Sequence, residues 1–370
     1  MSSYLLQIQE LLPEISEADL RLPLQEGCID SIDLVCIRAL LEKRVGELPD
    51  VVWNQFTTVQ QAIDYCEKED AGQGLAAEAE PVLLQREHEI NMPQMARGCL
   101  SEHWLFKELG DLHWVLLAAG LGTPSGELKD NRGARLYATF VRIQMVHDPL
   151  YSFRENEKLN LQGALRRFGV STYISQVEGS CSGKGLNALL MTTFSARVEG
   201  NNTALLKSEP LVRHNGVSEY VLMPTFLRDY RLLRKGLLEE FLISGIPFSI
   251  AGEVLFETEY DIHPYYEING VGLLYFAAYP VISDVGEASY FNQIAKERHC
   301  WEDRYSTTVR DVFYFANCNS DDRVVYQLNS VDPIEEDKIR LCSTLYRKSD
   351  GALMARLFTV KKVKPENRLQ

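Results

Sequence analysis

Two hydroxyl side chains in this sequence have neighbours that could give them a chemical role. Ser31 stands between two aspartates in "GCIDSIDLV", directly before an apolar run, and its acidic surroundings make it a poor nucleophile by itself. Tyr137 stands in the alternating segment "RLYATF", where Arg135 and Thr139 share its face of a predicted strand. An unperturbed phenol has a pKa of about 10. A tyrosine nucleophile therefore needs a nearby cation, for which Arg135 is the local candidate.

The histidines and cysteines form no recognisable metal or nucleophile motif. The 8 cysteines are scattered without a CxxC pair, which predicts free buried thiols rather than a zinc site or a disulfide framework. His103 and His113 lie on one predicted helix with side chains about 80° apart, so they do not form a pair. Neither belongs to a GxSxG or HExxH sequence. We therefore expect no metal site.

Residues 1–68 have the pattern of a small helical domain. Apolar residues recur at helical spacing in "SSYLLQIQELLPEIS" and again after Asp30 or Ser31, either of which can cap the second helix. Gly46 is expected to end that helix, and "TTVQQAIDYCEK" predicts a third one. Residues 69–82 contain "EDAGQGLAAEAE", which has no apolar period and predicts a flexible linker.

The negative charge of the chain is concentrated in its first 80 residues. The formal net charge is −14, and residues 1–80 hold 5 Lys/Arg against 16 Asp/Glu. Nucleic acids bind to basic surfaces, so this composition excludes a nucleic-acid partner; acidic helices would instead attract basic proteins. No apolar run approaches the roughly 18–20 residues that span a bilayer, and the N-terminus has no signal-peptide pattern. We expect a cytoplasmic protein with no membrane partner.

Residues 83–370 predict a larger domain in which long strands surround helices. An apolar helix is expected to begin at Ser101 and to end at Gly120 or Gly122. Runs that alternate with a period of two residues then predict strands in "ARLYATFVRIQMV", "VSTYISQVEG" and "ALLMTTFSARVEG".

The second half of this domain appears as a repeat of the first. We expect a strand over 265–282, a helix over 287–300 and four strands after it, the last two joined by a turn at Ser349–Gly351. Two units of long strands around a central helix, residues 83–230 and 231–370, predict a double hot-dog fold. The whole chain is thus expected to be α+β, with a helical bundle before the double hot dog.

The segment "GCIDSIDLV" resembles the signature of acyl carrier proteins, in which a glycine is followed shortly by Asp-Ser-Leu/Ile at the start of the second helix. The length, the acidity and the third helix of residues 1–68 agree with that family. In the family the serine carries 4′-phosphopantetheine, and the resemblance implies the same for Ser31. A phosphopantetheinyl transferase would then be a partner, because Ser31 need not react unaided.

Four longer segments carry a second resemblance: "NMPQMARGCLSEHWLFKELGDLHW", "RLYATFVRI", "EINGVGLLYFAAYP" and "STLYRKSDGALMAR". They look like the double hot-dog bifunctional acyltransferase/decarboxylase of the leinamycin pathway (LnmK type), from about Met92 to Lys362. The resemblance implies that methylmalonyl-CoA or a related acyl-CoA acylates Tyr137, that CO₂ is lost, and that a propionyl thioester forms on a carrier protein. The fused carrier departs from the standalone form and implies that acceptor and enzyme share one chain.

Loss of CO₂ from a malonyl-type thioester produces an enolate, whose oxygen needs hydrogen-bond donors. The amide of Asn269 and the backbone N–H of Gly270 are the candidates, although Asn-Gly is also a turn signal. His113 is expected to contact the substrate. A dehydratase of the same fold would instead combine a histidine of one half with an acid of the other, for which His113 and Asp284 are available.

These observations predict an enzyme of polyketide biosynthesis with 4′-phosphopantetheine as cofactor and a CoA thioester as substrate. Polyketide synthase modules or other acyl carrier proteins would be its partners, and the prediction is compatible with a homodimer. Two alternatives remain open. One is a dehydratase or thioesterase that acts on a carrier-bound acyl chain, and the other is a docking protein without catalysis that only presents the carrier.

Overall fold

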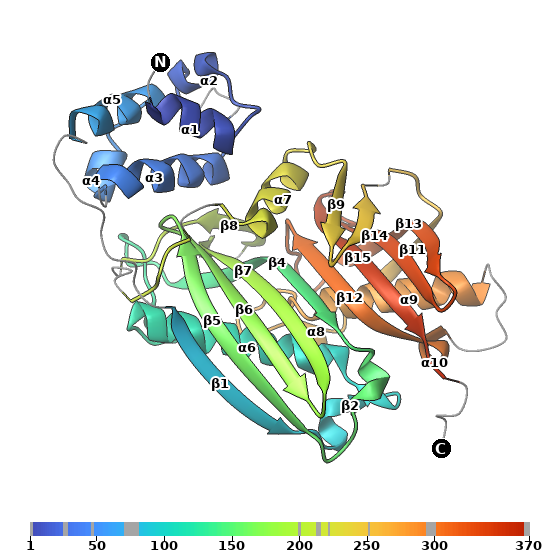
Figure 1. The fold of residues 1–370 in the computed structure, drawn as a ribbon. Helices are drawn as coiled ribbons and strands as arrows, with labels where there is room; N and C mark the ends of the chain where they lie inside the picture. Colours follow the sequence, from blue (N-terminus) through green and yellow to red (C-terminus); the bar gives the residue numbers. More distant parts are fainter. Residues whose placement is uncertain are drawn as a thin grey trace.

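The chain folds into an N-terminal helical bundle and a long curved antiparallel sheet with two long helices against one face (Figure 1). We call the sheet face that these two helices cover the inner face, and the opposite one the outer face. The computed structural model describes the following residues, to which all structural statements below refer: 3–24, 29–45, 48–69, 81–198, 201–211, 216–220, 223–250, 252–293 and 301–365.

The three helices predicted in the N-terminal bundle are present, and two short ones accompany them. The bundle consists of α1 (Ser3–Leu11), α2 (Glu17–Arg21), α3 (Ser31–Val45), α4 (Asp50–Trp53) and α5 (Val59–Glu69). Their apolar stripes meet in one core, which includes Ile8, Leu12, Leu20, Ile37, Ile63 and Cys66. The expected stop at Gly46 and most of the expected linker lie outside the described residues.

Helix α3 begins with a reciprocal cap made by two aspartates. The Asp30 carboxylate accepts hydrogen bonds from the backbone N–H groups of Ile32 and Asp33, at 2.7 and 2.9 Å. The Asp33 carboxylate accepts from the backbone N–H of Asp30 at 2.9 Å. Of the two predicted caps, Asp30 is therefore the one used, and Ser31 is the first residue of the helix.

The large domain contains two units with the same order of elements. The first consists of β1 (Val82–Glu89), α6 (Glu102–Leu121), β4 (Leu136–His147), β5 (Lys158–Phe168), β6 (Thr172–Cys181) and β7 (Lys184–Val198). The second consists of β11 (Phe256–Asp261), α9 (Ala278–Gln293), β12 (Tyr305–Tyr314), β13 (Arg323–Glu335), β14 (Lys338–Arg347) and β15 (Leu353–Val363). The strand orders, β1-β5-β6-β7-β4 and β11-β13-β14-β15-β12, are equivalent. The chain thus has the predicted α+β architecture of two units, each with long strands around one helix.

The remaining elements are short or connect the two units. Strand β8 (Asn201–Lys207) pairs with β7, and α7 (Thr225–Arg234) and the hairpin of β9 (Glu240–Ile243) and β10 (Ile246–Ser249) follow it. The predicted division after residue 230 falls inside α7. The other short elements are β2 (Met95–Ala96), β3 (Cys99–Leu100), α8 (Pro264–Glu267), α10 (Trp301–Arg304) and single 3₁₀ turns at Met92–Gln94, Ser125–Glu127 and Leu150–Ser152.

The two units join through one short stretch of strand pairing. β4 and β12 run antiparallel and pair only from Val146↔Val309 to Arg142↔Phe313. At this seam the Arg142 guanidinium binds the Asp311 carboxylate through two hydrogen bonds, of 3.0 and 2.7 Å, and both side chains are buried. Beyond the seam the N-terminal half of β4 has no partner in the second unit among the described strands.

The central helix of the first unit begins and ends as predicted. The Ser101 hydroxyl accepts a hydrogen bond from the backbone N–H of Trp104 at 3.2 Å, and Gly122 closes α6 with φ of 60°, in the left-handed region. Gly120 has another function: a Cβ there would come within 2.5 Å of a Val217 methyl group. Close packing therefore accounts for Gly120, and helix termination accounts for Gly122.

The strand predicted over 265–282 is wrong. This segment forms α8, a loop and the first turn of α9. Gly272 has φ of 82°, which turns the chain where a strand would have to continue. Leu274 and Ala277 are buried because the loop packs into the core, so the apolar run reflects burial rather than a strand. The helix predicted over 287–300 overlaps the second half of α9.

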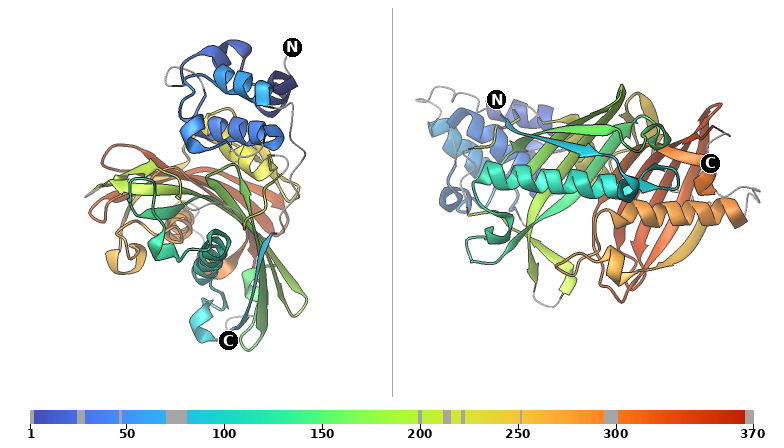
Figure 2. Two further views of the ribbon diagram at one scale, coloured as in Figure 1. Left: turned by 90° about the vertical axis from the view of Figure 1, so that its left-hand side faces the viewer. Right: turned by 90° about the horizontal axis from the view of Figure 1, so that it is seen from below.

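The sheet carries an apolar layer on each face. α6 and α9 pack against the inner face (Figure 2). The N-terminal bundle and α7 pack against the outer face, where Phe168, Ile174 and Met191 of the sheet belong to the same apolar cluster as the bundle core (Figure 2). The bundle therefore has a defined position on the large domain.

Candidate functional site

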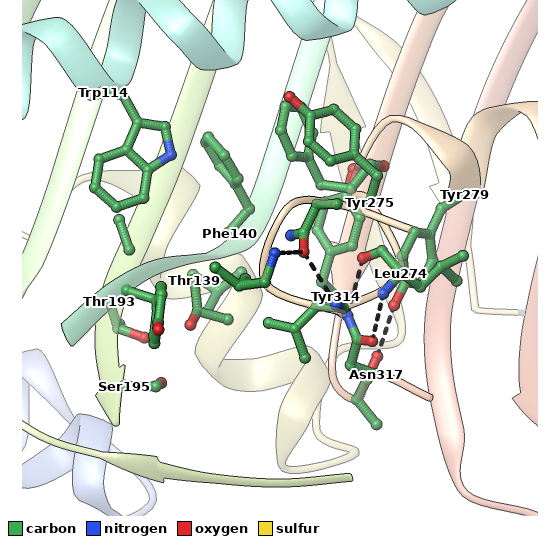
Figure 3. Close-up of a pocket in the computed structure, with 18 of the residues that line it drawn as sticks. Trp114, Thr139, Phe140, Thr193, Ser195, Leu274, Tyr275, Tyr279, Tyr314 and Asn317 are labelled. Carbon is green, nitrogen blue, oxygen red and sulfur yellow. Dashed lines mark hydrogen bonds between the residues drawn. The ribbon is translucent and has the colours of Figure 1, made fainter. Parts of the chain in front are cut away.

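A cavity of about 620 Å³ lies where β4 and β12 separate beyond the seam. Its walls come from the N-terminal half of β4, from β7, from α6, from the loop before α9 and from the residues that follow β12. Its size is typical of a small-molecule site. Figure 3 shows the side chains of the two units on opposite sides of this space.

Four hydroxyl groups form the polar wall of the cavity on the outer face of the sheet. Along β4, Ala138 and Phe140 belong to the inner core, so Tyr137 and Thr139 point to the outer face. In the strand register, Tyr137 lies opposite Ser195 of β7, and Thr139 lies opposite Thr193. Figure 3 labels Thr139, Thr193 and Ser195. Ser195 in turn pairs with Lys207 of β8. Tyr137, Ser195 and Lys207 therefore form one row across three strands, and all three line the cavity.

The predicted neighbour of the tyrosine is in place. Arg135 lies over the Tyr137 ring, with 5.1 Å from the guanidinium carbon to the ring centre. The contact is a cation–π contact with the ring face rather than a hydrogen bond to the phenol oxygen. Tyr137, Thr139 and Arg135 all line the cavity, as their shared strand face predicts.

The loop before α9 brings Asn269 and Gly270 to the opposite wall. The Asn269 side-chain oxygen accepts the backbone N–H groups of Val271 and Leu273, at 3.1 and 3.0 Å. Asn269 therefore organises the turn, and its Nδ2 group is the end of the side chain that can donate to a ligand. Both interpretations of the Asn-Gly pair, turn and donor, are thus compatible with its position.

Hydrogen bonds from the end of β12 hold this loop in place. The Asn317 carboxamide accepts the backbone N–H of Leu274 at 2.9 Å and donates to the carbonyl of the same residue at 3.0 Å (Figure 3). The Tyr314 hydroxyl donates to the Phe276 carbonyl at 3.1 Å, and the Tyr279 hydroxyl to the Ala316 carbonyl at 2.9 Å. Burial raises the pKa of both phenols, so they remain neutral hydrogen-bond donors.

His113 does not reach the cavity, and its expected contact with the substrate is not supported. The side chain is fully buried between α6 and the sheet, and its two ring nitrogens lie 2.7 Å from the Ser175 hydroxyl and 2.8 Å from the Thr192 hydroxyl. Burial lowers the pKa of His113 to about 3. The ring is therefore a neutral core group.

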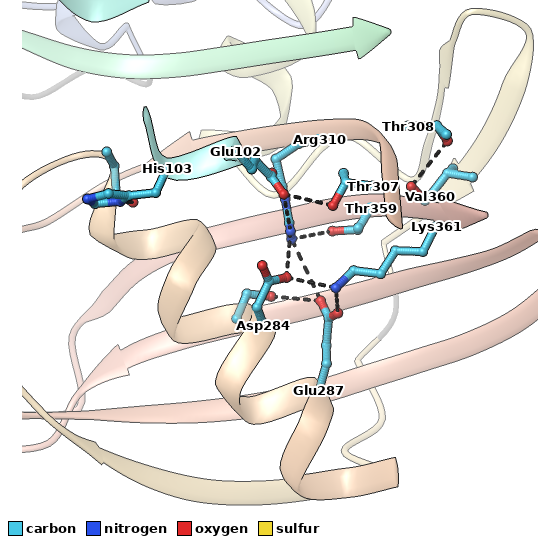
Figure 4. Close-up of polar contacts among 12 residues, drawn as sticks. Glu102, His103, Asp284, Glu287, Thr307, Thr308, Arg310, Thr359, Val360 and Lys361 are labelled. Carbon is cyan, nitrogen blue, oxygen red and sulfur yellow. Dashed lines mark hydrogen bonds and ion pairs between the residues drawn. The ribbon is translucent and has the colours of Figure 1, made fainter. Parts of the chain in front are cut away.

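Asp284 lies in a separate cluster of charged side chains to which both units contribute (Figure 4). Its carboxylate accepts hydrogen bonds from Arg310 and Lys361, at 2.7 and 2.8 Å. Glu102 and Glu287 complete the cluster. Because His113 and Asp284 are each committed to other partners, the dyad that a dehydratase would use is not formed.

The structure offers no evident metal centre within its described ranges, where no three His, Cys, Asp or Glu side chains come together. Of the helices that the structure describes, none has the length and apolarity to cross a membrane.

Sequence reasoning missed the partners of Tyr137 on the neighbouring strands. Thr193 and Ser195 alternate with buried Phe194 and Ala196, so the strand pattern contained the signal that they share a face. Which β4 residues they lie opposite depends on the register between β4 and β7, and the sequence of one strand does not determine that register. No local pattern in the sequence indicated Lys207 or Asn317 as site residues, because only the tertiary fold brings them to the cavity.

No protein-family model matches the sequence, and a search of curated protein sequences also finds no match. Solved structures do resemble it. A protein described as an oleoyl thioesterase from Lactobacillus plantarum is 11% identical, with a TM-score of 0.53 over 77% of this chain and 97% of its own. A 12:0-ACP thioesterase from Umbellularia californica is 8% identical, with a TM-score of 0.49 over 79% of this chain and 100% of its own. An acyl-ACP thioesterase from Bacteroides thetaiotaomicron is 11% identical, with a TM-score of 0.48 over 76% and 98%.

At such low identity this likeness concerns the fold. The large domain has the hot-dog fold, present as two units in one chain. By its fold and its cavity, the large domain falls into the class of double hot-dog proteins.

Proposed function

We propose that the chain is an acyl carrier domain fused to a double hot-dog acyltransferase/decarboxylase of polyketide-type biosynthesis. In this proposal a phosphopantetheinyl transferase attaches 4′-phosphopantetheine to Ser31. Support comes from the position of Ser31 as first residue of α3 in an acidic bundle, with Asp30 supplying the cap. The serine is thus not required for capping.

The composition of the cavity is the observation that carries the enzymatic part of the proposal. Its polar lining consists of hydroxyl and amide groups together with the cations Arg135, Lys207 and Arg234, and its described lining contains neither histidine nor cysteine. The one lining carboxylate, Asp111, is exposed and bound to Arg86 at 2.7 Å. Hydrolysis of a thioester needs a base that activates water. Acyl transfer followed by loss of CO₂ needs a nucleophile and donors to an enolate, which this wall can supply.

In the proposed reaction the Tyr137 oxygen attacks the thioester carbonyl of methylmalonyl-CoA. The carbon–sulfur bond breaks, and the phenol proton ends on the CoA thiol. The carbon–carbon bond to the carboxylate then breaks, CO₂ leaves, and the resulting enolate takes up a proton to give propionyl-tyrosine. Phosphopantetheine on Ser31 would supply the thiol that accepts the propionyl group as a thioester, and Tyr137 would recover its phenol proton in that exchange.

Residues around the tyrosine have defined tasks in this scheme. Arg135 orients the ring through its cation–π contact. The Nδ2 group of Asn269 and the backbone N–H of Gly270 donate to the enolate oxygen. Aromatic side chains from the inner side of the sheet, among them Trp114 and Phe140, complete the lining of the cavity.

A thioesterase is the second candidate, because the solved structures of similar fold are described as thioesterases. That likeness concerns the fold, and the described lining offers neither a histidine nor an unpaired carboxylate as the base. A dehydratase is disfavoured by the separate placement of His113 and Asp284. A docking protein without catalysis would have no use for the row of polar side chains.

The test is to load Ser31 with a broad-specificity phosphopantetheinyl transferase and to add methylmalonyl-CoA. We expect release of CO₂ and a propionyl group on the Ser31 peptide, identified by mass spectrometry. Free methylmalonic acid without CO₂ would identify a thioesterase, and absence of any turnover in a loaded chain would support the docking protein. A Ser31→Ala chain serves as the control without an acceptor.

A further inference from the structure

Part of the cavity lining comes from the side of the sheet that carries the N-terminal bundle. Two of the lining residues, Tyr230 and Arg234, come from α7, and a third, Lys207, ends β8. Both elements lie on the side of the outer face, which also carries the bundle (Figure 2). The rim nearest to the bundle therefore holds two cations.

Helix α7 presents neighbouring faces to the cavity and to the bundle. Tyr230 and Arg234, four residues apart, line the cavity. Arg231 and Lys235, also four residues apart, both bind the Asp33 carboxylate of α3. Asp33 is fully buried, so this contact is a specific one rather than a surface encounter.

Lys207 is also electrostatically coupled to the start of α3. Burial lowers the pKa of Lys207, and the nearby Asp30 carboxylate opposes that effect, whereas the nearby Arg234 adds to it. The residues at positions −1 and +2 from Ser31 thus both face the rim. The start of α3 therefore contacts α7 through Asp33 and lies within electrostatic range of Lys207.

We propose that Lys207 and Arg234 bind the phosphodiester of a phosphopantetheine arm on Ser31, and that the arm enters the cavity of its own chain there. This inference rests on the proposed modification of Ser31. A phosphodiester carries one negative charge, which a guanidinium binds through its fork of donors and an ammonium binds as a point charge.

The row across the sheet leads from this phosphate position to the nucleophile. Lys207, Ser195 and Tyr137 occupy three adjacent strands. Adjacent strands are about 4.8 Å apart, so Tyr137 lies roughly 10 Å from Lys207 along the sheet. An extended pantetheine chain covers this distance. Delivery within one chain then needs no movement of the bundle.

The test measures how well the arm thiol is protected from alkylation, without any acyl-CoA present. The full-length chain is loaded with phosphopantetheine, treated with N-ethylmaleimide, and the modified Ser31 peptide is quantified over time by mass spectrometry. We expect slow alkylation in the wild-type chain. The pair Lys207→Gln and Arg234→Gln should accelerate it about tenfold or more, since each charge-assisted contact shifts such an equilibrium by about that factor.

Two further pairs control for charge and for folding. Lys158→Gln with Arg228→Gln removes the same charge from exposed positions on β5 and α7 and should keep the arm protected. Lys207→Arg with Arg234→Lys keeps both cations and should also protect it. If the Gln pair lowers the Tm of the unmodified chain, the single Lys207→Gln variant replaces it. We then expect faster alkylation than in the wild-type chain, by a smaller factor than for the pair.

The outcomes separate this inference from the proposed function. If Ser31 accepts no phosphopantetheine, both fail. If it is loaded but its thiol reacts equally fast in the wild-type and Gln-pair chains, the phosphodiester site is wrong while the carrier assignment stands. If the Gln pair changes only the KM for methylmalonyl-CoA, the two cations bind the phosphates of free CoA, and the inference is likewise overturned.

Discussion

Tyr137 owes its position to the alternation of β4, which sends every second side chain to the outer face of the sheet. The sequence therefore predicts that Tyr137, Arg135 and Thr139 share a face, and all three line the cavity. His113 could not be placed in the same way. α6 is buried on most sides, so its apolar pattern does not show which side faces the cavity.

Replacing Tyr137 by phenylalanine tests the nucleophile. Tyr137→Phe keeps the ring and its contact with Arg135 but removes the oxygen that would carry the acyl group. We expect transfer to the Ser31 arm to fall at least about 10³-fold, as for other lost nucleophiles. Acyl transfer is measured by mass spectrometry of the Ser31 peptide, with Tyr346→Phe on β14 as the matched control. A wild-type rate in Tyr137→Phe would exclude the acyl-tyrosine route.

Asn269 has a turn role and a proposed donor role that two substitutions can separate. Asn269→Asp keeps the oxygen that accepts the Val271 and Leu273 N–H groups but loses the amide donor. We expect CO₂ release to fall about 10²–10³-fold, with little change in Tm. Asn269→Ala should lower both the rate and the Tm. If Asn269→Asp retains the wild-type rate of CO₂ release, Asn269 serves only the turn.

At the scale of the elements, the strand patterns predicted the second unit well where local signals were strong. The Ser349–Gly351 turn joins β14 and β15 as expected, with Gly351 at φ of 70°. The prediction of a strand over 265–282 was wrong because an apolar loop and an apolar strand have the same composition. The sequence has no signal for what a loop packs against, and that contact decides its conformation.

The seam between the two units should depend on one buried ion pair. Arg142→Met leaves the buried Asp311 carboxylate without its guanidinium. We expect the free energy of unfolding to fall by about 3–5 kcal/mol, the usual cost of breaking a buried pair. Urea denaturation measures it. Arg323→Met, which breaks an exposed pair with Glu259, should cost less than about 1 kcal/mol. Equal losses in the two variants would show that the seam does not depend on this pair.

The charged cluster around Asp284 gives a pH-dependent contribution to stability. Burial alone would raise the pKa of Asp284, but Lys361 and Arg310 outweigh it and lower that pKa. A lowered carboxyl pKa stabilises the fold above the unfolded value of about 4 and loses that effect as the pH falls through the folded value. We expect the Tm of Asp284→Asn to lie below that of the wild-type chain at pH 7. The difference should shrink below about pH 4, and a difference that stays constant would contradict this.

At the scale of the whole molecule, the sequence predicted the two parts but not how they meet. Charge and helical period identified an acidic bundle, and alternation identified the large domain. The contact of Asp33 with Arg231 and Lys235 joins residues about 200 positions apart, and no local pattern specifies such a pair. The cavity likewise needs the register between β4, β7 and β12, which only the folded sheet defines.

Under the proposed function, this arrangement favours delivery of the acyl group within one chain. Arg231 and Lys235 of α7 bind Asp33 near the start of α3, and α7 also lines the cavity. In the proposal, an arm on Ser31 reaches Tyr137 without leaving its own chain. The effective concentration of a tethered acceptor exceeds any micromolar concentration of free carrier.

The most direct measurement is the rate at which the propionyl group appears on the Ser31 arm over a hundredfold range of protein concentration. The phosphopantetheinylated chain is mixed with a saturating amount of methylmalonyl-CoA, and the Ser31 peptide is followed by mass spectrometry. We expect a first-order rate constant that does not change with protein concentration. A rate constant that rises in proportion to protein concentration, or an arm that never acquires a propionyl group, would contradict it.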